Sequence, residues 1–363
     1  MKLAFYIFGT TNFQDMFPII FSSIRDEEAC WVCFFDIFNA KRQLYNYSEE
    51  EVKVFFEEKC KELNLKVPKI NFYRHNDQEK LNRDYQSFSP DFIFAQEIKP
   101  KSTYWYPPTK AKVIHLAWWD ESHHLKDNKH LKPHISILKQ KEDKRFYQKY
   151  HTRYFGDLRL EHLKYSKASV GNKKRCFIPE TYMRINQDYA EINKELISFY
   201  NQLFKFLKNK DIEIVWKKRE KGFPKGKWAS PLDFTDTQPD KVIEKDLIFP
   251  SSLVDEAYQA DFCFIVDDSF AYFDIINVNS NCYILYVNKK RKYKIDEFFL
   301  EYKNKIIEIN AKDSWKKIEE VCNLKNNFKK ENLVLDNPSN KILKYCREII
   351  KNEKNSSNTD KDK

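Results

Sequence analysis

The sequence has no long hydrophobic run. None of its apolar stretches approaches the ~20 residues that a membrane-spanning helix needs, which argues against an integral membrane protein. The apolar stretch Leu3–Phe8 is followed at once by polar residues, so we expect a first strand and turn there rather than a signal peptide. The expected location is the cytoplasm.

Cysteine pairs at metal-ligand spacing are also scarce. Of the eight cysteines, Cys30 and Cys33 form one C-x-x-C, but both lie within an apparent strand and no second pair follows at the spacing of a zinc site. Cys263 and Cys282 lie within apolar runs, which is typical of small core residues. We therefore expect free cysteines in a reducing compartment, no zinc or redox site, and no required cofactor; Mg²⁺ is compatible with the sequence but not demanded by it.

Glycine is rare, with five residues against the ~7% of an average protein. Gly9 closes the first predicted strand, Gly156 lies in a turn, and Gly171 lies in a short polar, basic stretch. Gly222 and Gly226 lie in a basic loop. The few glycines therefore mark predicted turns and connections.

Charged and aromatic residues, by contrast, are abundant. Charged residues make up 33% of the chain, aromatic residues 16%, and the net charge is +10. A basic balance favours anionic partners such as nucleotides, phosphorylated acceptors, an anionic membrane face or nucleic acid, although a lysine-rich solvated surface explains the charge equally well. No recognisable nucleic-acid-binding module is present, so we do not expect a nucleic-acid partner.

The N-terminal half alternates predicted strands with predicted helices. After a cap at Ser48, apolar residues recur at Val52, Phe55, Phe56 and Leu63, which is the spacing of one helix face. A repeated βα pattern indicates a parallel sheet covered by helices. The predicted strands cover residues 2–8, 30–38, 69–75, 90–98, 112–119 and 135–139, and the predicted helices cover residues 10–26, 48–65 and 77–87.

A second βα series follows a polar, basic stretch at residues 165–175, which is the expected linker. Two α/β domains are therefore expected, at residues 1–164 and 176–335, each Rossmann-like and facing the other across a cleft. A helix at residues 336–350 and a disordered polar tail at residues 351–363 complete the prediction. Predicted strands of this half cover residues 176–180, 212–218, 261–266 and 282–287, and predicted helices cover residues 187–207 and 270–278, with a short one after 250–252.

The most informative segment joins two predicted strands. The strand at residues 261–266 ends in Asp267, Asp268 and Ser269, and a helix follows. In a parallel sheet this turn lies at the carboxyl ends of the strands, where free N–H groups and the positive end of a helix attract phosphate. Ser269 would bind phosphate through its hydroxyl, whereas Asp267 and Asp268 suit a ribose or sugar hydroxyl. A simple helix cap explains the same residues equally well.

Two other groups are candidate contacts to a nucleotide. Lys217, Lys218 and Arg219 end a buried-looking strand, where charge indicates a cleft; Arg grips phosphate bidentately and Lys acts as a point charge. A basic surface loop is equally compatible with these three residues. Ser252 and Asp255 form a capping-box-like pair, so we expect a structural role there, with a nucleotide contact second.

The densest polar cluster of the N-terminal half follows the strand at residues 112–119. Carboxylate and imidazole side chains serve as general bases, and we expect Asp120 or Glu121, then His115, to take that role here. His115 lies inside the strand, so a satisfied core histidine is the alternative. The spacing fits no standard metal site. The cluster consists of His115, Trp118, Trp119, Asp120, Glu121, His123 and His124.

Three stretches, in this order, resemble motifs of one group of enzymes. Gly156–Leu160 is similar to a Gly-Asp-Pro-Arg-Leu turn, and Trp216–Glu220 to a strand that ends in a basic, phosphate-facing run. Asp267–Ser269 is similar to an Asp-x-Ser turn that opens a helix against the donor nucleotide. The group is that of the GT-B fold enzymes related to CDP-glycerol glycerophosphotransferases and UDP-N-acetylglucosamine epimerases.

This resemblance implies a role for each domain. The N-terminal domain would be the acceptor domain; it would supply the general base and approach the acceptor with the turn Gly9, Thr10 and Thr11. The C-terminal domain would be the nucleotide-donor domain and would hold a nucleotide diphosphate through Lys217 to Arg219 and Ser269.

The sequence departs from the pattern of the group in several places. Ser280, Asn281 and Cys282 stand where Gly-x-Pro is usual, and Phe270 replaces a small hydroxyl residue. Asp274 stands for the acidic residue of the donor-binding helix.

The expected function is a glycosyl or polyol-phosphate transferase that uses a nucleotide-activated donor in the synthesis of surface polysaccharide or lipopolysaccharide. Its acceptor would be a glycan or a lipid-linked molecule. The basic run at residues 289–292 would allow peripheral contact with the anionic inner face of the membrane. A nucleotide-sugar epimerase of the same fold, a degenerate non-catalytic protein and a basic nucleic-acid-binding protein are the alternatives.

Overall fold

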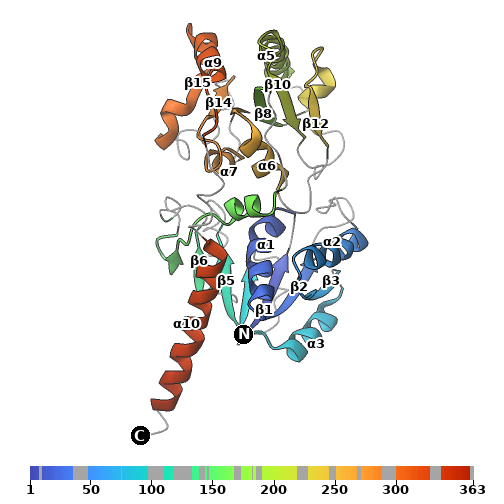
Figure 1. Cartoon of the computed structure of the whole chain (residues 1–363), viewed down its shortest axis with the longest axis vertical. Coiled ribbons are helices and arrows are strands. Elements are labelled where there is room, and N and C mark those ends of the chain that lie inside the picture. The colour runs from blue at the N-terminus through green and yellow to red at the C-terminus, as the bar shows by residue number, and fades with distance from the viewer. Residues whose placement is uncertain are drawn as a thin grey trace. The chain divides into compact units, whose positions relative to one another are not determined.

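The chain divides into two compact units in the computed structural model (Figure 1). Unit 1 consists of Met1–Glu161 and Glu331–Lys363, and unit 2 of His162–Lys330. The predicted domains were 1–164 and 176–335, and residues 167–172 of the predicted linker lie outside the described residues. The structure describes residues 1–7, 10–35, 48–74, 76–96, 110–117, 133–138, 144, 147–166, 173–181, 183–184, 190–218, 228–244, 251–267, 271–287, 300–327 and 337–359.

Unit 1 is built on a seven-stranded sheet whose neighbouring strands are all parallel. The strand order reverses between β1 and β4, so these two strands flank the topological switch point of the sheet. In spatial order the strands are β3 (Lys69–Tyr73), β2 (Ala29–Phe35), β1 (Lys2–Ile7), β4 (Phe92–Ala95), β5 (Lys112–Leu116), β6 (Ile135–Ile137) and β7 (Thr152–Arg153).

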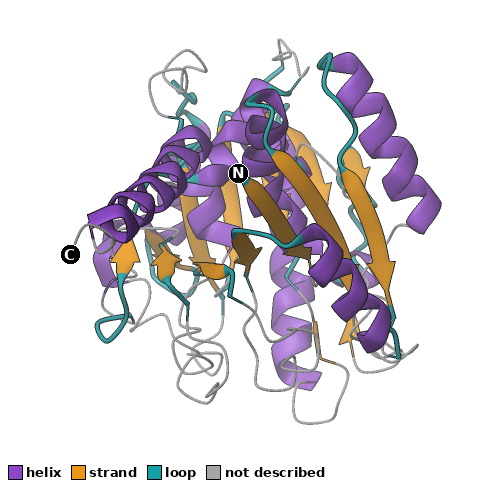
Figure 2. Cartoon of the chain, turned by 90° about the horizontal axis from the view of Figure 1, so that it is seen from below, coloured by secondary structure: helices purple, strands orange, loops and turns teal. Residues whose placement is uncertain are grey.

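Helices lie on both faces of this sheet (Figures 1 and 2). On one face α1 (Thr10–Arg25) and α2 (Glu49–Glu62) meet where Phe17 and Phe56 pack with ring centroids 5.4 Å apart. On the other face α3 (Gln78–Phe88) places Phe88 5.4 Å from the ring of Trp31. Successive side chains of β2 point alternately to these two faces of the sheet, as the pleat of a strand buried on both faces requires.

The predicted cap of α2 is confirmed. Ser48 Oγ accepts a hydrogen bond from the Glu51 N–H at 3.1 Å, and Glu51 Oε2 accepts one from the Ser48 N–H at 2.6 Å. This reciprocal pair is a capping box, and it satisfies two donors that would otherwise lack partners at the start of the helix.

Unit 2 contains a six-stranded sheet, again with all neighbouring strands parallel. Its strand order reverses between β8 and β13, which makes this pair the switch point of unit 2. In spatial order the strands are β12 (Lys241–Ile243), β10 (Glu213–Lys217), β8 (Arg175–Pro179), β13 (Phe262–Val266), β14 (Cys282–Tyr286) and β15 (Ile306–Glu308).

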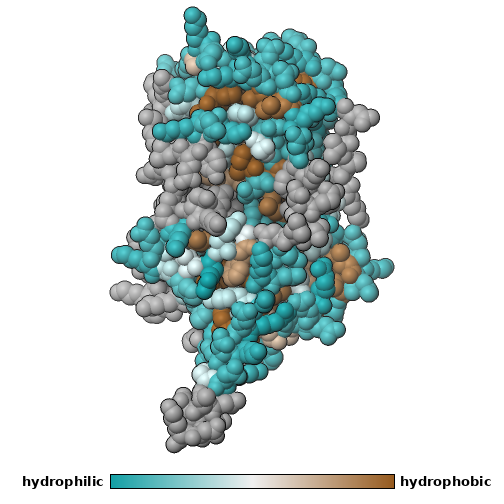
Figure 3. All heavy atoms as spheres, turned by 60° about the vertical axis from the view of Figure 1, so that its left-hand side comes forward, coloured by the Kyte–Doolittle hydropathy of each residue, from teal (hydrophilic) through white to brown (hydrophobic). Residues whose placement is uncertain are grey.

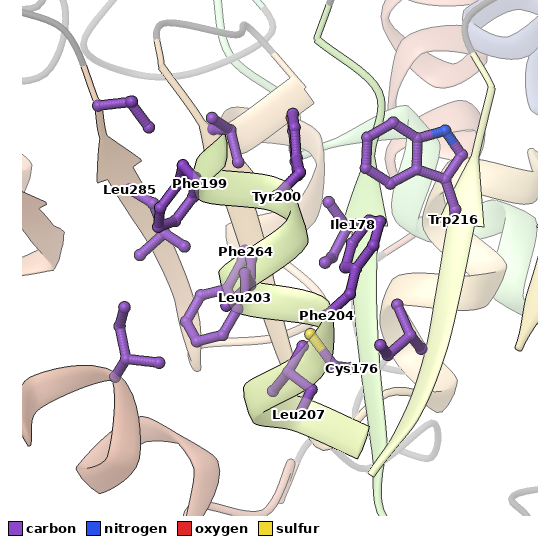
Figure 4. Close-up of a cluster of buried hydrophobic side chains, with 14 of the residues drawn as sticks. Cys176, Ile178, Phe199, Tyr200, Leu203, Phe204, Leu207, Trp216, Phe264 and Leu285 are labelled. Carbon is purple, nitrogen blue, oxygen red and sulfur yellow. The ribbon is translucent and has the colours of Figure 1, made fainter. Parts of the chain in front are cut away.

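The core of unit 2 lies between its sheet and two helices, α5 (Ala190–Asn209) and α9 (Ser314–Cys322). Trp216 of β10 packs against Tyr200 and Phe204 of α5, with ring centroids 5.0 and 5.7 Å apart (Figure 4). On the opposite face Cys263 of β13 lies against Ala257 of α6 (Ser252–Gln259), which is followed by α7 (Ala271–Ile276). The predicted α/β class and the two Rossmann-like sheets are therefore confirmed.

Several short elements complete the described part of the chain. A two-stranded antiparallel pair joins β9 (Met183–Arg184) and β11 (Trp228–Ala229). The 3₁₀ helices are η3 (Leu158–Lys164), η5 (Pro231–Phe234) and η7 (Leu300–Lys305). All eight cysteines are free and buried, as expected of core residues.

Within the described ranges, no helix has both the length and the apolar character needed to cross a lipid bilayer. The face shown in Figure 3 is mostly hydrophilic, in keeping with a chain that is one-third charged.

The C-terminal prediction needs a correction. Helix α10 (Pro338–Thr359) is longer than the predicted helix at 336–350, so the expectation of a disordered tail was wrong for residues 351–359. This polar segment continues the helix, and an ion pair of 2.7 Å between Glu353 Oε2 and Lys112 Nζ anchors it to unit 1. The composition alone gave no sign of that distant partner.

Removal of a core side chain of unit 2 should lower the free energy of unfolding far more than removal of an exposed side chain on the same helix. Leu203→Ala removes a fully buried side chain of α5 and should lower the free energy of unfolding by about 2–5 kcal/mol. Lys205→Ala, at an exposed position of α5, should change it by less than about 0.5 kcal/mol. Urea denaturation measures both, and equal losses would contradict the packing described here.

Candidate functional site

The carboxyl ends of the strands at the switch point are the places where open parallel sheets usually bind ligands. In unit 2 these ends are followed by Glu180 and Thr181 after β8 and by Asp267 after β13. Thr181 Oγ1 donates a hydrogen bond to the Val266 carbonyl at 2.6 Å, which ties the two strand ends together. Glu180 is 6% exposed, and its carboxylate accepts a hydrogen bond from Ser230 Oγ. The switch point of unit 2 therefore holds an ordered set of polar groups.

Two lysines end the neighbouring strand β10. Lys217 is only 8% exposed, and its carbonyl accepts a hydrogen bond of 2.9 Å from the Glu180 N–H. Lys218 Nζ pairs with Glu244 Oε1 at 2.8 Å, and this bond raises the pKa of Lys218, so the ammonium stays charged. The predicted placement of two cations beside the strand ends is thus found in the fold, whereas Arg219 lies outside the described residues.

Asp267 forms hydrogen bonds with backbone groups of the neighbouring strand. Its φ of 57° lies in the left-handed region, which is uncommon for a residue other than glycine. The carboxylate Oδ1 accepts a hydrogen bond from the Val287 N–H at 3.1 Å, and the Asp267 N–H donates one to the Leu285 carbonyl at 2.9 Å. Asp267 therefore joins the ends of β13 and β14. Asp268, Ser269 and Phe270 lie outside the described residues, so a contact to phosphate or sugar here stays a prediction.

The start of α6 differs from the expected capping box. The N-cap is Ser251, not Ser252, and no side chain caps this helix; the Asp255 N–H donates to the Ser251 carbonyl at 3.0 Å. The Ser251 N–H itself donates to His162 Nδ1 at 2.8 Å. Ser251 has the extended backbone of a cap residue and Ser252 is already the first residue of α6, so the predicted capping-box-like pair of Ser252 and Asp255 was wrong.

The residues that replace Gly-x-Pro lie at the amino ends of the strands, opposite the carboxyl ends that form the switch point. Asn281 directly precedes β14, so it lies at the amino end of that strand, away from Asp267. Asn279 Nδ2 donates to the Ala260 carbonyl at 2.8 Å, and Asn281 Nδ2 donates to the Asp261 carbonyl at 3.0 Å. Asparagine side chains therefore stabilise this connection, and the substitution does not alter the strand ends at the switch point.

A buried ion pair lies at the switch point of unit 1. Arg159 Nε of η3 donates to Asp15 Oδ1 of α1 at 2.7 Å, and Gln96 Nε2, just after β4, donates to Asp15 Oδ2 at 2.9 Å. The three residues are 7% exposed or less. The resemblance to the Gly-Asp-Pro-Arg-Leu turn singled out the segment around Arg159. It did not indicate the partner Asp15, which is 144 positions away in the sequence.

His115 is buried at 1% exposure and both of its ring nitrogens are engaged. Nε2 lies 3.0 Å from the Gln96 carbonyl and Nδ1 lies 3.1 Å from Ser136 Oγ. Burial lowers the pKa of His115 from 6.5 to about 4, so the ring is neutral near pH 7. A carbonyl only accepts, so Nε2 carries the proton and Nδ1 accepts from Ser136. This geometry matches the alternative of a core histidine that links β4, β5 and β6.

The remaining candidates of the N-terminal half cannot be placed. Asp120 and Glu121, expected to act as the base, lie outside the described residues, as does Gly9. Thr10 and Thr11 begin α1, but the structure does not describe their side chains. Within the ranges that are described, no cluster of three or more His, Cys, Asp or Glu side chains is arranged to hold a metal ion.

Glu180, Thr181 and Gln96 were missed by the sequence analysis. Glu180 and Gln96 directly follow β8 and β4, but the predicted strands at 176–180 and 90–98 ran past the observed ends and included both residues. Thr181 directly follows the predicted strand at 176–180, so its position was a usable signal. Asp15 had no such signal, since it lies on an amphipathic helix among other polar residues.

Solved structures with similar folds cover nearly the whole chain. The complex of MnaA from S. aureus with UDP is 12% identical, with a TM-score of 0.56 and coverage of 97% of both chains. A UDP-N-acetylglucosamine 2-epimerase from Rickettsia bellii is 13% identical, with a TM-score of 0.51 and coverage of 95% of both chains. A structure from Listeria monocytogenes is 11% identical, with a TM-score of 0.57 and coverage of 94% of this chain and 95% of that one.

The fold is of the GT-B type. At this level of identity the similarity concerns the fold and not the reaction. Neither the comparison with protein-family models nor that with curated protein sequences gives a match.

The buried state of His115 predicts a pH dependence of stability. The folded pKa of His115 is depressed to about 4, so between about pH 6.5 and pH 4 the unfolded chain takes up a proton that the folded chain does not. This group contributes up to about 3 kcal/mol of stability near pH 7, which is lost as the pH falls through that window. Urea denaturation at a series of pH values should give a shallower pH slope for His115→Gln than for the wild type. Equal slopes in the wild type and His115→Gln would contradict the prediction.

Asp15→Ala should be strongly destabilising, because it leaves the guanidinium of Arg159 buried without its carboxylate. We expect a loss of about 3–5 kcal/mol in the free energy of unfolding. Asp26→Ala is the matched control: its carboxylate pairs with Arg347 at 2.6 Å, but at the surface, so the loss should be below about 1 kcal/mol. Denaturation curves of both variants measure the difference, and a loss in Asp15→Ala no larger than in the control would be inconsistent with a buried pair.

Proposed function

We propose that the chain is a transferase that moves a sugar or polyol phosphate from a nucleotide-activated donor to a hydroxyl acceptor. The observation that carries the proposal is the set of polar groups at the switch point of unit 2. Lys217 ends β10 and Lys218 follows it, and Glu180 and Thr181 follow the adjacent β8. Lysine near a diphosphate neutralises charge on the leaving nucleotide, which is what such a transfer requires.

The similar structures support a nucleotide as the ligand of this site. The MnaA structure contains UDP, and the Rickettsia bellii protein is named for a UDP-sugar substrate. A donor held at the strand ends of unit 2 would place its diphosphate near Lys217 and Lys218. Ser269 and Arg219 would add contacts, and Asp274 or Glu180 would accept from ribose hydroxyls.

In the proposed reaction an acceptor hydroxyl attacks the activated carbon or phosphorus of the donor. The new bond forms as the bond to the nucleotide breaks, and the nucleotide leaves with the electron pair. The proton of the hydroxyl passes to a base, for which Asp120 and Glu121 are the candidates. The acceptor would be a glycan or lipid-linked molecule of surface polysaccharide synthesis, reached from the cytoplasmic side of the membrane. No metal is required by the proposal, and the test below includes Mg²⁺.

A nucleotide-sugar epimerase is the second candidate, because the Rickettsia bellii structure carries that activity in its name at a TM-score of 0.51. The two reactions differ in their need for an acceptor. A transferase releases free nucleotide in proportion to added acceptor, whereas an epimerase converts the nucleotide-sugar to its epimer with no acceptor present.

Binding of one nucleotide should stabilise the protein against heat. We would measure the melting temperature with UDP, CDP, CMP, GDP and ADP, with and without Mg²⁺. A ligand at a hundredfold its dissociation constant adds about 2.7 kcal/mol of stability. Lys218→Ala should abolish most of the shift, since it removes a cation from the strand ends.

Lys241→Ala is the matched control. Lys241 also pairs with a glutamate at 2.8 Å in the same sheet, but it begins β12 and lies toward the amino ends of the strands. The control should keep the shift. Absence of a shift with every nucleotide, or an equal loss in both variants, would remove the support for a donor site at this place.

A further inference from the structure

A recess lies at the outer edge of unit 1, away from the switch point. It is bounded by the end of β7, which is three strands along from β4, and by the first half of α10. Figure 1 shows α10 running beside β6 at this side of the sheet. The recess has a volume of about 390 Å³, which is the size of a small-molecule pocket. Its lining consists of Arg153, Phe155, Lys341, Lys344, Tyr345 and Glu348.

Two aromatic rings form the apolar part of the recess. The ring centroids of Phe155 and Tyr345 lie 5.6 Å apart, and the guanidinium carbon of Arg153 lies 5.9 Å from the centroid of Tyr345. Burial raises the pKa of Tyr345, so its hydroxyl stays protonated and able to donate a hydrogen bond. The recess thus offers an apolar surface beside polar donors.

The described lining of the recess is mostly basic. Its basic residues are Arg153, Lys341 and Lys344, and its acidic residue is Glu348. Neither Arg153 nor Lys344 forms an ion pair with another described residue. Arg347, the next basic residue of α10, differs, because it is held by Asp26 at 2.6 Å and Glu28 at 2.9 Å and lies outside the recess. The like charges of Arg153 and Lys344 repel one another, and an anion between them would offset that repulsion.

We propose that this recess binds a phosphate ester. The phosphate would lie among Arg153, Lys341 and Lys344, and the ester group would pack against Phe155 and Tyr345. A planar guanidinium grips two phosphate oxygens at once, whereas the two lysines add point charges one helical turn apart. The site is separate from the proposed nucleotide site, lies wholly in unit 1, and requires no nucleotide.

The same chemistry occurs in a soluble phosphate ester and in the headgroup of an anionic lipid. We would titrate the full chain with phenyl phosphate and with inorganic phosphate by calorimetry. In a second arm, the chain would be sedimented with vesicles of phosphatidylglycerol and phosphatidylcholine, or of phosphatidylcholine alone. Melting temperatures of all variants check that they fold.

Three variants make the test specific. Arg153→Gln and Lys344→Glu should each weaken binding at least about tenfold, the effect of losing one charge-assisted contact. Lys351→Glu is the control, because Lys351 is exposed on the same helix two turns beyond Lys344 but does not line the recess. It should bind as the wild type does.

Each outcome decides the proposal. Binding of phenyl phosphate more tightly than inorganic phosphate, lost in Arg153→Gln and Lys344→Glu, supports a soluble ester. Sedimentation with phosphatidylglycerol vesicles alone, lost in the same variants, supports a lipid headgroup. The proposal is overturned if neither probe binds, if both phosphates bind equally, or if Lys351→Glu weakens binding as much as Lys344→Glu.

Discussion

The parallel pairing of every neighbouring strand in the two large sheets is the constraint on which the rest of this structure depends. Parallel strands need crossover connections, so helices cover both faces and the strands are apolar on both sides. The same pairing brings all carboxyl strand ends to one edge. The strand order reverses between β1 and β4 and between β8 and β13, and such places are where open parallel sheets usually bind ligands.

Polar groups at these two places are buried, and burial is costly unless each group has a partner. In unit 1 the carboxylate of Asp15 is satisfied by Arg159 and Gln96. In unit 2 the side chains of Thr181 and Asp267 bond to backbone groups of the neighbouring strands. These side chains hold the strand ends in place, so that a ligand would meet a preformed arrangement. Preorganised polar groups lower the cost of binding because they need little rearrangement.

Basic residues act differently according to their partners. Arg159 and Arg347 are committed to carboxylates within unit 1, and Lys218 is paired with Glu244 in unit 2. Arg153 and Lys344 instead line a recess beside α10. The basic residues behind the net charge of +10 therefore do not all have the same role. Some of them stabilise the units through ion pairs, whereas Arg153 and Lys344 form no ion pair with another described residue.

The sequence by itself determined the alternation of strands and helices, because apolar periodicity and capping at Ser48 are local signals. It also placed Lys217 and Lys218 at a strand end, since the apolar run Ile214–Trp216 directly precedes them. Tertiary structure alone decided the partners of Arg159 and the end of α10, which depend on residues 144 and 241 positions away. Short strands such as β7 and β15 were likewise settled by pairing, because two or three residues are too few to show a period.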